Sequence, residues 1–474
     1  MDLKRTKIVA TLGPASSSKE VIIEMHEKGL NVCRLNFSHG EHSIHKANID
    51  LIKSVNEEIG ANLAVLADLQ GPKLRVGAME NEGCEIKNGE KIIFTNEECL
   101  GTSKKVYMTY PQFAQDVKAG ELILIDDGKL AVRVESTDGK SEVIAVVEHG
   151  GILKSKKGVN LPNTIISLPS LTKKDREDLD FILTQDVEWL ALSFVRTAED
   201  IIELRKLITD AGRKIKIIAK IEKPEAIDNI DSIIEVTDAI MVARGDLGVE
   251  VPYQDVPLLQ KMMVKKCLKA SKPIIVATQM MESMIDGITP SRAEVNDVAN
   301  AVMDGADAVM LSGETSVGAH PGLVIETMTN IVTKVEQYDD IFNHDYMPIY
   351  KKERFISDNI CMNAVQLAKS VDAKAIVTMT VSGYTACKIS SHRPRAHTFV
   401  YTSNKEILNM LSLVWGVKAF YYDDSSSRDT NIEDIQASLV EKGFVKSGEY
   451  FINIASMPLK AKGKTNTLKL SQVN

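Results

Sequence analysis

Two opposite charges end a run of residues that otherwise has the pattern of a buried strand. In the stretch AKIEKPEAIDN, residues 219–229, Lys220 and Glu222 stand at the end of the apolar run 215–221. Residues two apart on a strand face the same side, so this ammonium and this carboxylate would reach one site. Such a pair suits chemistry on an anionic group, because the lysine can attract it and the carboxylate can hold a cation.

Polar residues end five further strand-like runs in the same way: Arg34, Asn36 and Ser38; Asp68; Arg244 and Asp246; Thr278 and Gln279; and Ser312 and Glu314. Strand ends meet solvent and are often polar, which would explain any single case. Six strands that share the feature favour one common site, because barrel enzymes place their catalytic residues at the carboxyl ends of several strands.

Glu222 and Asp246 form the candidate metal site. Two carboxylates with room for water are typical ligands of Mg²⁺ or Mn²⁺ that bridges to a substrate phosphate or carboxylate. The alternative is that they form salt bridges with Lys220 or Arg244. The glycine turn at Gly245 offers backbone N–H groups beside this site, although tight turns use glycine widely.

Arg34 and Arg75 carry planar guanidinium groups that can hold phosphoryl oxygens. The alternative is that they are ordinary surface arginines. The chain contains neither a GxxxxGK[ST] loop nor a GxGxxG turn after a strand. A nucleotide would therefore be held by side chains and metal rather than by a glycine-rich loop.

Eight short apolar runs alternate with helical patterns over the first 330 or so residues: KIVATLG, VCRLNFS, NLAVLADLQ, WLALSFV, IKIIAKIE, AIMVARGDLG, PIIVATQM and AVMLSGET. This alternation predicts an α/β fold with a (β/α)8 TIM barrel formed by residues 1–70 and 170–338. Hairpin signals at KNGE, Asp127-Gly128 and Asp138-Gly139 predict an inserted all-β lid, a small β-barrel, at 71–169. A linker from residue 337 would lead to a C-terminal αβ regulatory domain at 339–474.

Composition excludes some classes of protein. A formal charge of −8 and a pI near 5.7 argue against a nucleic-acid or anionic-membrane partner. The six cysteines lack zinc or disulfide spacing, and no secretory leader or membrane-length apolar run is present. These features predict a cytoplasmic protein.

The motifs VCRLNFSHG, KGVNLP, AKIEKPEAIDN, MVARGDLGVE, VATQMMESM and MLSGETSVGAHP resemble, in order, those of the pyruvate kinase family. The resemblance spans essentially the whole chain. It implies phosphoryl transfer from phosphoenolpyruvate to ADP, which gives pyruvate and ATP in the last step of glycolysis. It also implies Mg²⁺ (or Mn²⁺) as the cofactor and a homotetramer as the assembly.

The resemblance assigns roles to the matching residues. Arg34 and Lys220 would contact the transferred phosphoryl group, Glu222 and Asp246 would bind the metal, and Gly245, Asp246 and Thr278 would lie at the substrate. The residues expected on the nucleotide side are Asn36, Phe37, Ser38, His39, Arg75 and Lys157. The proton that completes pyruvate would arrive near Thr278 through groups such as Ser312 and Glu314, and the donor among them stays open.

One departure from the family pattern concerns the monovalent cation. Much of the family has DTKGPEIR where this chain has DLQGPKLR at 68–75, so Leu69 and Lys73 replace a threonine and a glutamate. The usual K⁺ site also involves the positions of Asn36, Ser38 and Asp68. We expect the Lys73 ammonium to take over the charge of K⁺, so that K⁺ is not required. A neutral surface substitution is the alternative.

The stretch TVSGYTA in the C-terminal domain matches a region where the family often binds a sugar-phosphate effector. The hydroxyl groups of Thr380, Ser382 and Thr385 around Gly383 could surround the phosphate of a sugar-phosphate or nucleotide effector. A plain strand–turn–helix junction would use the same residues.

Two other functions fit parts of the pattern. A non-catalytic metabolite sensor could keep the fold, although the intact Arg34, Lys220, Glu222, Asp246 and Thr278 argue against it. A different barrel enzyme that acts on phosphoenolpyruvate or the pyruvate enolate is the second. The inserted lid, the nucleotide-side residues and the C-terminal domain argue against that one.

Overall fold

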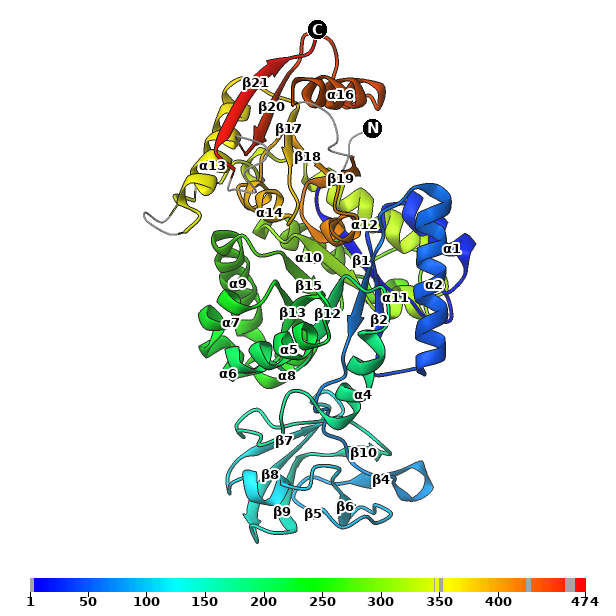
Figure 1. Cartoon of the computed structure of the whole chain (residues 1–474). Helices are drawn as coiled ribbons and strands as arrows, with labels where there is room; N and C mark the ends of the chain where they lie inside the picture. Colours follow the sequence, from blue (N-terminus) through cyan, green and yellow to red (C-terminus); the bar gives the residue numbers. More distant parts are fainter. Residues whose placement is uncertain (1–3, 345, 349–352, 423–427, 457–464) are drawn as a thin grey trace.

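A computed structural model describes residues 4–344, 346–348, 353–422, 428–456 and 465–474 of the 474-residue chain. Three parts follow one another along the long axis of the molecule (Figure 1). A β-rich part lies at one end, a barrel lies in the middle and an αβ part lies at the other end. Part of the predicted linker, residues 345 and 349–352, lies outside the described residues.

The middle part is a closed barrel of eight parallel strands in the order β1-β16-β15-β14-β13-β12-β3-β2. Its strands are β1 (Lys7–Thr11), β2 (Val32–Asn36), β3 (Ala64–Asp68), β12 (Trp189–Leu192), β13 (Lys216–Ile221), β14 (Ala239–Ala243), β15 (Ile274–Ala277) and β16 (Ala308–Leu311). Each lies within one of the eight predicted runs, which confirms the TIM barrel. The runs are largely apolar because side chains on both faces of a barrel strand are covered.

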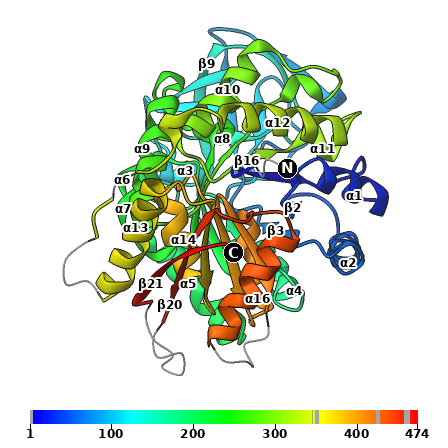
Figure 2. The same cartoon turned by 90° about the horizontal axis from the view of Figure 1, so that it is seen from above.

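Helices surround the barrel, as the view along the long axis shows (Figure 2). They are α1 (Lys19–Glu27), α2 (His42–Ile59), α4 (Lys173–Ile182), α5 (Ala198–Asp210), α6 (Pro224–Asp228), α7 (Ile230–Val236), α8 (Arg244–Glu250), α9 (Val256–Ala270), α10 (Arg292–Asp304), α11 (Gly313–Ser316) and α12 (Pro321–Val335). Capping boxes start three of them, with Thr172, Thr197 and Ser291 each three residues before an acidic residue. Such caps satisfy N–H groups that the first helical turn leaves unpaired.

The inserted part follows β3 and contains β4 (Gly83–Ile86), β5 (Lys91–Thr95), β6 (Lys105–Tyr107), β7 (Leu122–Ile125), β8 (Leu130–Thr137), β9 (Glu142–His149), β10 (Gly151–Lys154), β11 (Val159–Asn160) and the short helix α3 (Phe113–Asp116). Its main sheet has the order β11-β7-β8-β9-β5-β6. Arg75 bridges to Gly158 next to β11, and Val76 bridges to Met108 next to β6. One segment thus joins both edges of the sheet, which closes it into the predicted small barrel.

The predicted hairpins of the insert are partly confirmed. Asp127-Gly128 joins the antiparallel pair β7 and β8, and Asp138-Gly139 joins β8 and β9. The hairpin predicted at KNGE is wrong, because β4 before it pairs with β10 and β5 after it pairs with β9 and β6. Turn residues there mark a change of direction between two sheets, and turn chemistry alone does not choose the partner of a strand.

The C-terminal part has a five-stranded sheet in the order β19-β18-β17-β20-β21, antiparallel only at β21. Its elements are β17 (Ala375–Met379), β18 (His397–Thr402), β19 (Val417–Tyr421), β20 (Tyr450–Ala455) and β21 (Thr467–Gln472), with α13 (Phe355–Ser370), α14 (Tyr384–Ser391), α15 (Glu406–Met410) and α16 (Arg428–Glu441). The predicted αβ character is confirmed, whereas the predicted domain limits at residues 70, 169 and 338 stay predictions.

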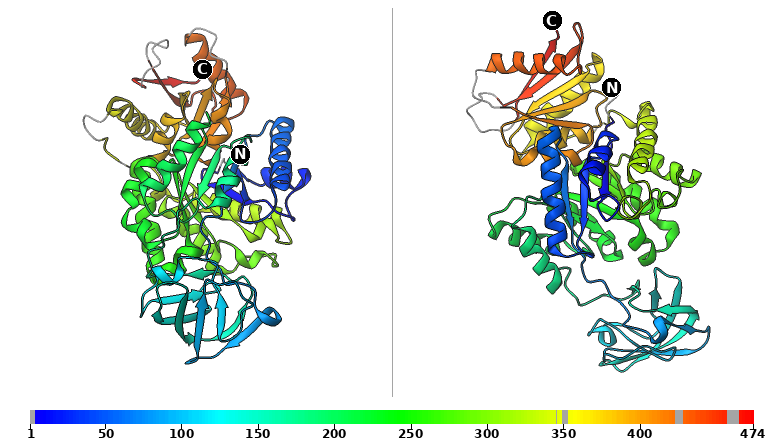
Figure 3. Two further views of the ribbon diagram at one scale, coloured as in Figure 1. Left: turned by 60° about the horizontal axis from the view of Figure 1, so that its bottom comes forward. Right: turned by 90° about the vertical axis from the view of Figure 1, so that its right-hand side faces the viewer.

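The C-terminal part packs on the amino ends of the barrel strands. Trp189, at the start of β12, donates its indole N–H to the carbonyl of Met410 at 3.1 Å. Arg393 pairs with Asp307, which precedes β16, at 3.1 Å. The insert therefore lies at the opposite, carboxyl end (Figure 3). Within the described residues no helix is long and apolar enough to cross a membrane.

Candidate active site

Four charged side chains meet where the barrel strands end toward the insert. Arg34 comes from β2, Asp68 from the last position of β3, Lys220 from β13, and Glu222 from the residue that follows β13. All four are buried, with exposed fractions between 1% for Asp68 and Glu222 and 9% for Lys220. We call these residues the charge cluster.

Asp68 lies between the two cations of the charge cluster. Arg34 places its Nε and Nη2 at 2.7 Å from Asp68 Oδ2. Lys220 Nζ lies 3.3 Å from Asp68 Oδ1 and 2.9 Å from Glu222 Oε1. The salt bridge between Lys220 and Glu222, which the sequence left open as an alternative, is therefore present in the structure.

Burial and pairing act in opposite directions on the pKa values of the charge cluster. Burial alone would lower the pKa of Lys220, yet the carboxylates of Asp68 and Glu222 raise it above its usual value. Burial favours a higher pKa for Asp68, but Lys220 and Arg34 hold it below the usual value. Lys220 and Asp68 are consequently charged at neutral pH, and the Lys220 ammonium offers positive charge in a region shielded from water.

Of the two carboxylates in the charge cluster, Glu222 has the less compensated negative charge. Burial raises its pKa, Lys220 opposes that shift, and the nearby charge of Asp246 adds to it. Glu222 Oε2 accepts a hydrogen bond from the backbone N–H of Phe194 at 2.8 Å. A divalent cation between Glu222 and Asp246 would relieve their repulsion, and both groups offer the oxygen donors that Mg²⁺ and Mn²⁺ prefer.

Gly245 and Thr278 lie beside this acidic pair. The backbone N–H of Gly245, in the first turn of α8, donates to Thr278 Oγ1 at 2.7 Å. Thr278 follows β15 and has φ of 71°, a left-handed conformation that is rare for a β-branched residue. Arg244 does not reach the cluster, because its guanidinium pairs with Asp297 at 2.6 Å.

Ser312 and Glu314 follow β16, at the turn into the short helix α11. The Glu314 carboxylate is buried and accepts the backbone N–H of Ser312 at 2.7 Å and of Met281 at 3.2 Å. These contacts hold the turns after β15 and β16 together. They favour a positioning role for Glu314 and leave its predicted part in proton delivery a prediction.

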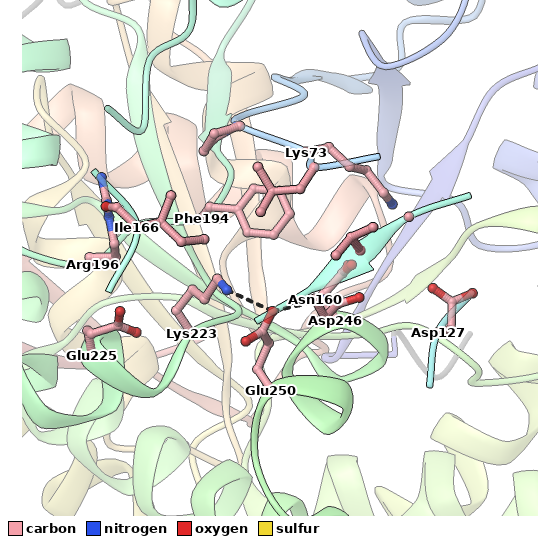
Figure 4. A pocket seen from close by; sticks show the side chains of 14 residues that line it. Lys73, Asp127, Asn160, Ile166, Phe194, Arg196, Lys223, Glu225, Asp246 and Glu250 are labelled. Atoms are coloured by element: carbon pink, nitrogen blue, oxygen red, sulfur yellow. Dashed lines mark hydrogen bonds and ion pairs between the residues drawn. The ribbon is translucent and has the colours of Figure 1, made fainter. Parts of the chain in front are cut away.

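A cleft separates the barrel from the insert, and Asp246 and Lys73 both line it (Figure 4). Asn160 of the insert donates to Glu250 Oε1 at 2.8 Å, and Lys223 Nζ lies 2.7 Å from the same oxygen. Glu250 and Lys223 are buried. This contact ties the insert to the barrel at the rim of the cleft.

The residues predicted for the nucleotide come from both the barrel and the insert. Asn36 ends β2 and Ser38 and His39 belong to the turn after it, whereas Arg75 and Lys157 belong to the insert. Lys157 pairs with Asp126 at 2.8 Å, and Arg75 donates to the carbonyl of Lys156 at 3.1 Å. In the described residues no hydrogen bond or ion pair joins the two groups.

Phe37, also predicted on the nucleotide side, has an exposed fraction of 1%. Its ring stacks on His45 with ring centroids 4.0 Å apart. The side chain is therefore part of the packing between β2 and α2. Its backbone is engaged as well, because the N–H donates to the carbonyl of Asp68 at 2.9 Å and the carbonyl accepts from Lys174 Nζ at 2.7 Å.

The two substituted positions of the predicted K⁺ site differ in their surroundings. Leu69 is 1% exposed and belongs to the barrel core. Lys73 is exposed and lines the cleft. In the part of the chain that the structure describes, no carboxylate lies within 4.0 Å of its ammonium.

The predicted effector residues occupy the junction of β17 and α14. The N–H of Gly383, which has φ of 80°, donates to Thr380 Oγ1 at 3.1 Å. Ser382 is exposed, whereas Thr385 is buried with its hydroxyl 3.2 Å from that of Thr465. Thr380 and Ser382 could face a ligand, while Thr385 is engaged in packing.

Two site residues were missed in the sequence. Thr11 Oγ1 accepts from Arg34 Nη1 at 2.8 Å, and Ser193 Oγ accepts from Lys220 Nζ at 2.7 Å. Thr11 ends β1 and Ser193 follows β12. The rule applied to the other six strand ends would have identified both.

Comparison with known proteins agrees with this architecture. Family models described as the barrel domain and the alpha/beta domain of pyruvate kinase match residues 3–325 and 358–471. A pyruvate kinase from Geobacillus stearothermophilus is 42% identical over 475 residues, which cover 99% of this chain and 81% of that protein. A pyruvate kinase from Staphylococcus aureus (strain MRSA252) is 40% identical over 477 residues, with the same coverage.

A solved structure leads to the same family. The crystal structure of a pyruvate kinase from Cryptosporidium parvum is 33% identical in sequence and has a TM-score of 0.93. The match covers 100% of this chain and 97% of that one. With the closed barrel, the curled insert and the C-terminal αβ part, these matches show that the chain belongs to the pyruvate kinase family of phosphotransferases.

Proposed function

We propose that the protein transfers the phosphoryl group of phosphoenolpyruvate to ADP in a Mg²⁺-dependent reaction that yields pyruvate and ATP. The charge cluster supports the proposal most directly. It holds two buried cations, Arg34 and Lys220, beside the acidic pair Glu222 and Asp246 at the mouth of the barrel. Phosphoryl transfer needs mainly positioning and positive charge around the moving group, and this arrangement can supply both.

In the proposed reaction the bond between phosphorus and the enol oxygen breaks, and a bond from phosphorus to a terminal oxygen of ADP forms. Arg34 and Lys220 would stabilise the charge on the phosphoryl oxygens. Glu222 and Asp246 would hold Mg²⁺, which supplies further neutralisation of that charge when bound. The N–H of Gly245 and the hydroxyl of Thr278 would hold the substrate carboxylate, which would replace their present acceptors, Thr278 Oγ1 and the carbonyl of Ala277.

The enolate that remains must gain a proton on carbon to become pyruvate. Thr278 lies at the end of β15, close to the turn that Ser312 and Glu314 build. We place this proton transfer on the Thr278 side, with Glu314 acting through the turns that it holds together. A Glu314→Gln variant keeps one acceptor oxygen for these two backbone N–H groups, so a loss of stability together with a loss of activity would support that positioning role.

A coupled assay of pyruvate formation tests the function. We expect turnover only when phosphoenolpyruvate, ADP and Mg²⁺ are all present. Pyruvate formation that needs no ADP would indicate another enzyme of the phosphoenolpyruvate or enolate class. Complete inactivity of well-folded protein under all metal and nucleotide conditions would favour a metabolite sensor.

We also propose that the reaction does not require K⁺. The side chain of Leu69 offers no oxygen to a cation and packs in the core, while Lys73 lines the cleft without a carboxylate partner among the described residues. Closure of the insert over the barrel would bring that positive charge to the active site. Assays in tetramethylammonium salts should show the same rate with and without K⁺, and strong activation by K⁺ would contradict the proposal.

A further inference from the structure

The turn after β2 is held by two helices that lie far apart in the sequence. It consists of residues 36–39, which are predicted on the nucleotide side, and it follows the strand that supplies Arg34 to the charge cluster. The helix α2 begins at His42, shortly after the turn, whereas α4 begins at Lys173, where the chain returns from the insert. The helix α4 lies at the end of the barrel that faces the insert (Figure 1). We call residues 36–39 the β2 turn.

The backbone of the β2 turn is hydrogen-bonded along its length. The N–H of Phe37 donates to the carbonyl of Asp68 at 2.9 Å, which fixes the turn to the end of β3. The N–H of Ser38 donates to Asn36 Oδ1 at 3.1 Å, and the N–H of His39 donates to the Asn36 carbonyl at 3.2 Å. These contacts come from the turn itself and from β3, whereas the carbonyl of Phe37 is held by α4.

Lys174 of α4 makes this contact. Its Nζ donates to the carbonyl of Phe37 at 2.7 Å and to Asp178 Oδ2 at 2.6 Å. A charged donor makes a stronger hydrogen bond than a neutral donor does. The Lys174 side chain is 46% exposed, so this pairing contributes little to stability. We therefore expect the contact to act on the position of the turn rather than on the stability of the fold.

Asp178 determines where the Lys174 ammonium lies. It is 4% exposed, and its Oδ1 lies 2.7 Å from Nε2 of His42 at the start of α2. The His42 ring stacks on Phe181 of α4, with ring centroids 4.4 Å apart. The carboxylate is therefore fixed by α2 and α4 together, and it directs the lysine at the β2 turn.

The side chain of Phe37 packs between the same two helices. Its ring stacks on His45 of α2, and it lies 6.2 Å from the ring of Phe181 of α4, measured between centroids. Nε2 of His45 also lies 2.9 Å from the carbonyl of His39, the last residue of the turn. Packing therefore fixes the ring of Phe37, and Lys174 fixes the carbonyl of the same residue.

The first turn of α4 gives Lys174 a fixed base. Thr172 and Asp175 form the capping box that starts the helix. Asp175 is fully buried, and its Oδ1 accepts the N–H of Gly71, the first residue of the predicted insert, at 3.0 Å. The helix that holds the β2 turn thus also holds the chain where it enters the insert. Both groups of residues predicted for the nucleotide are therefore positioned relative to α4.

We propose that Lys174 is a positioning residue for the nucleotide, which holds the β2 turn in the conformation that binds ADP and does not contact the ligand itself. The inference rests on the proposed function, because it takes ADP as the ligand. His39 is exposed and Ser38 is half-buried, and a shift of the Phe37 carbonyl would displace both. Loss of the Lys174 contact should weaken the binding of ADP and spare that of phosphoenolpyruvate.

Calorimetric titration of the full chain with ADP and Mg²⁺ tests the inference without turnover. Lys174→Met should bind ADP about tenfold more weakly, because the turn loses a charge-assisted hydrogen bond. Lys174→Arg should restore much of the affinity, since it keeps a charged donor. Lys173→Met is the matched control, because it removes the same charge from an exposed neighbour on the same helix, and it should bind like the wild type. Unchanged ADP affinity in Lys174→Met would overturn the inference.

Steady-state kinetics separate positioning from a structural role. Lys174→Met should raise the KM for ADP about tenfold, while kcat and the KM for phosphoenolpyruvate at saturating ADP stay within about twofold of the wild type. An equal loss for both substrates, or a fall in kcat with an unchanged KM for ADP, would indicate a general disturbance of the site. Either result would contradict a role confined to the nucleotide.

A double-variant cycle distinguishes positioning from direct contact. His39→Ala removes the exposed side chain of the β2 turn and should itself weaken the binding of ADP. If Lys174 acts through the turn, Lys174→Met should have little further effect on ADP affinity in the His39→Ala background. An equal loss of affinity in both backgrounds would assign Lys174 to direct contact with the nucleotide and overturn the positioning role. Wild-type affinity in His39→Ala would exclude the turn from the nucleotide site, with the same consequence.

Failure of the proposed function would give a different result from failure of this inference. Wild-type protein that forms pyruvate without ADP, or forms none, would contradict the proposed reaction. If that protein still bound ADP and Lys174→Met bound it about tenfold more weakly, the positioning role would stand. Wild-type protein that binds no ADP in the titration would overturn both. Normal ADP-dependent turnover with an unchanged KM for ADP in Lys174→Met would overturn the positioning role alone.

Discussion

At the carboxyl end of β13 the buried Lys220 lies against carboxylates, whereas at the amino end of β1 the buried Lys7 does not, within the described residues. Lys220 contacts Asp68 and Glu222 at 3.3 and 2.9 Å. Lys7 contacts only the carbonyl of Val417 at 2.8 Å in the described residues. The pKa of Lys220 is raised and that of Lys7 is lowered to about 8, although both are buried. Partners, and not burial alone, decide whether a buried lysine keeps its charge.

The same strand links these two environments. β1 begins at Lys7, in the wall of a cavity between the barrel and the C-terminal part, and ends at Thr11, which accepts from Arg34 in the charge cluster. At the carboxyl end Lys220 has two carboxylate partners. At the amino end Lys7 has no carboxylate partner among the described residues. Four experiments test this contrast.

The largest effect is expected from Lys220→Met. It should lower phosphoryl transfer by about 100-fold or more, because one cation is lost from the reacting centre. Steady-state kinetics measure the loss, and circular dichroism checks that the fold is kept. Lys53→Met is the matched control, since Lys53 is exposed and pairs with Asp186 on the surface. Comparable activity of the two variants would remove Lys220 from the proposed mechanism.

Asp68→Asn should reduce the free energy of unfolding by about 3 kcal/mol, because it leaves Arg34 and Lys220 with one carboxylate fewer. Urea denaturation measures the change, and Asp50→Asn on the surface should cost less than about 0.5 kcal/mol. The pKa of Asp68 is lowered in the folded protein. Its contribution to stability is therefore full above the unfolded pKa near 3.9 and is lost as the pH falls through the folded pKa.

An Asp68→Asn variant as stable as the wild type would contradict this contrast, since the buried Arg34 and Lys220 would then not need the carboxylate of Asp68. The variant should also lack the part of the acid dependence that Asp68 provides. Stability curves of both proteins from pH 7 down through the lowered pKa of Asp68 test this second outcome.

Lys73 is the exception at the catalytic end, because its ammonium has no carboxylate partner among the described residues. Lys73→Glu should lower turnover without K⁺ by about tenfold, in line with the loss of one interaction with a charged group. Added K⁺ should restore part of the rate. If the variant stays independent of K⁺, Lys73 is an ordinary surface residue and does not replace the cation. Lys129→Glu on the exposed face of the insert is the control.

Lys7→Met should raise the free energy of unfolding by about 1 kcal/mol at pH 7, since it replaces an uncompensated buried cation by an apolar group. Lys7 has a pKa of about 8 when folded and near 10.5 when unfolded. Between these values the unfolded wild type binds more protons, so its stability rises with pH there. The variant should lack this rise. Destabilisation at pH 7 would mean that Lys7 is adequately paired.

The sequence predicted the barrel well because all eight strands are short apolar runs with polar ends. Lys220 and Glu222 could be placed on one face from their spacing alone. The same rule would have found Thr11 and Ser193 had it been applied to every strand. Family motifs then assigned roles that spacing could not.

The sequence did not decide which strands pair within the insert. KNGE looks like a hairpin, yet the strands on its two sides belong to different sheets. Local turn chemistry fixes a change of direction, but the partner of a strand depends on contacts far along the chain. Nor did sequence show that Phe37 is packed against His45, since its place among predicted ligand residues came from a motif.

By itself the sequence determined the type and order of the elements and the chemical groups at the strand ends. Only the tertiary structure decided which charges are neighbours. It placed Asp68 between Arg34 and Lys220, and it brought Lys4 and Lys7 to a cavity that Val417 and His397 also line. Electrostatic interaction depends on distance and on exposure to water, and neither can be read from separation along the chain.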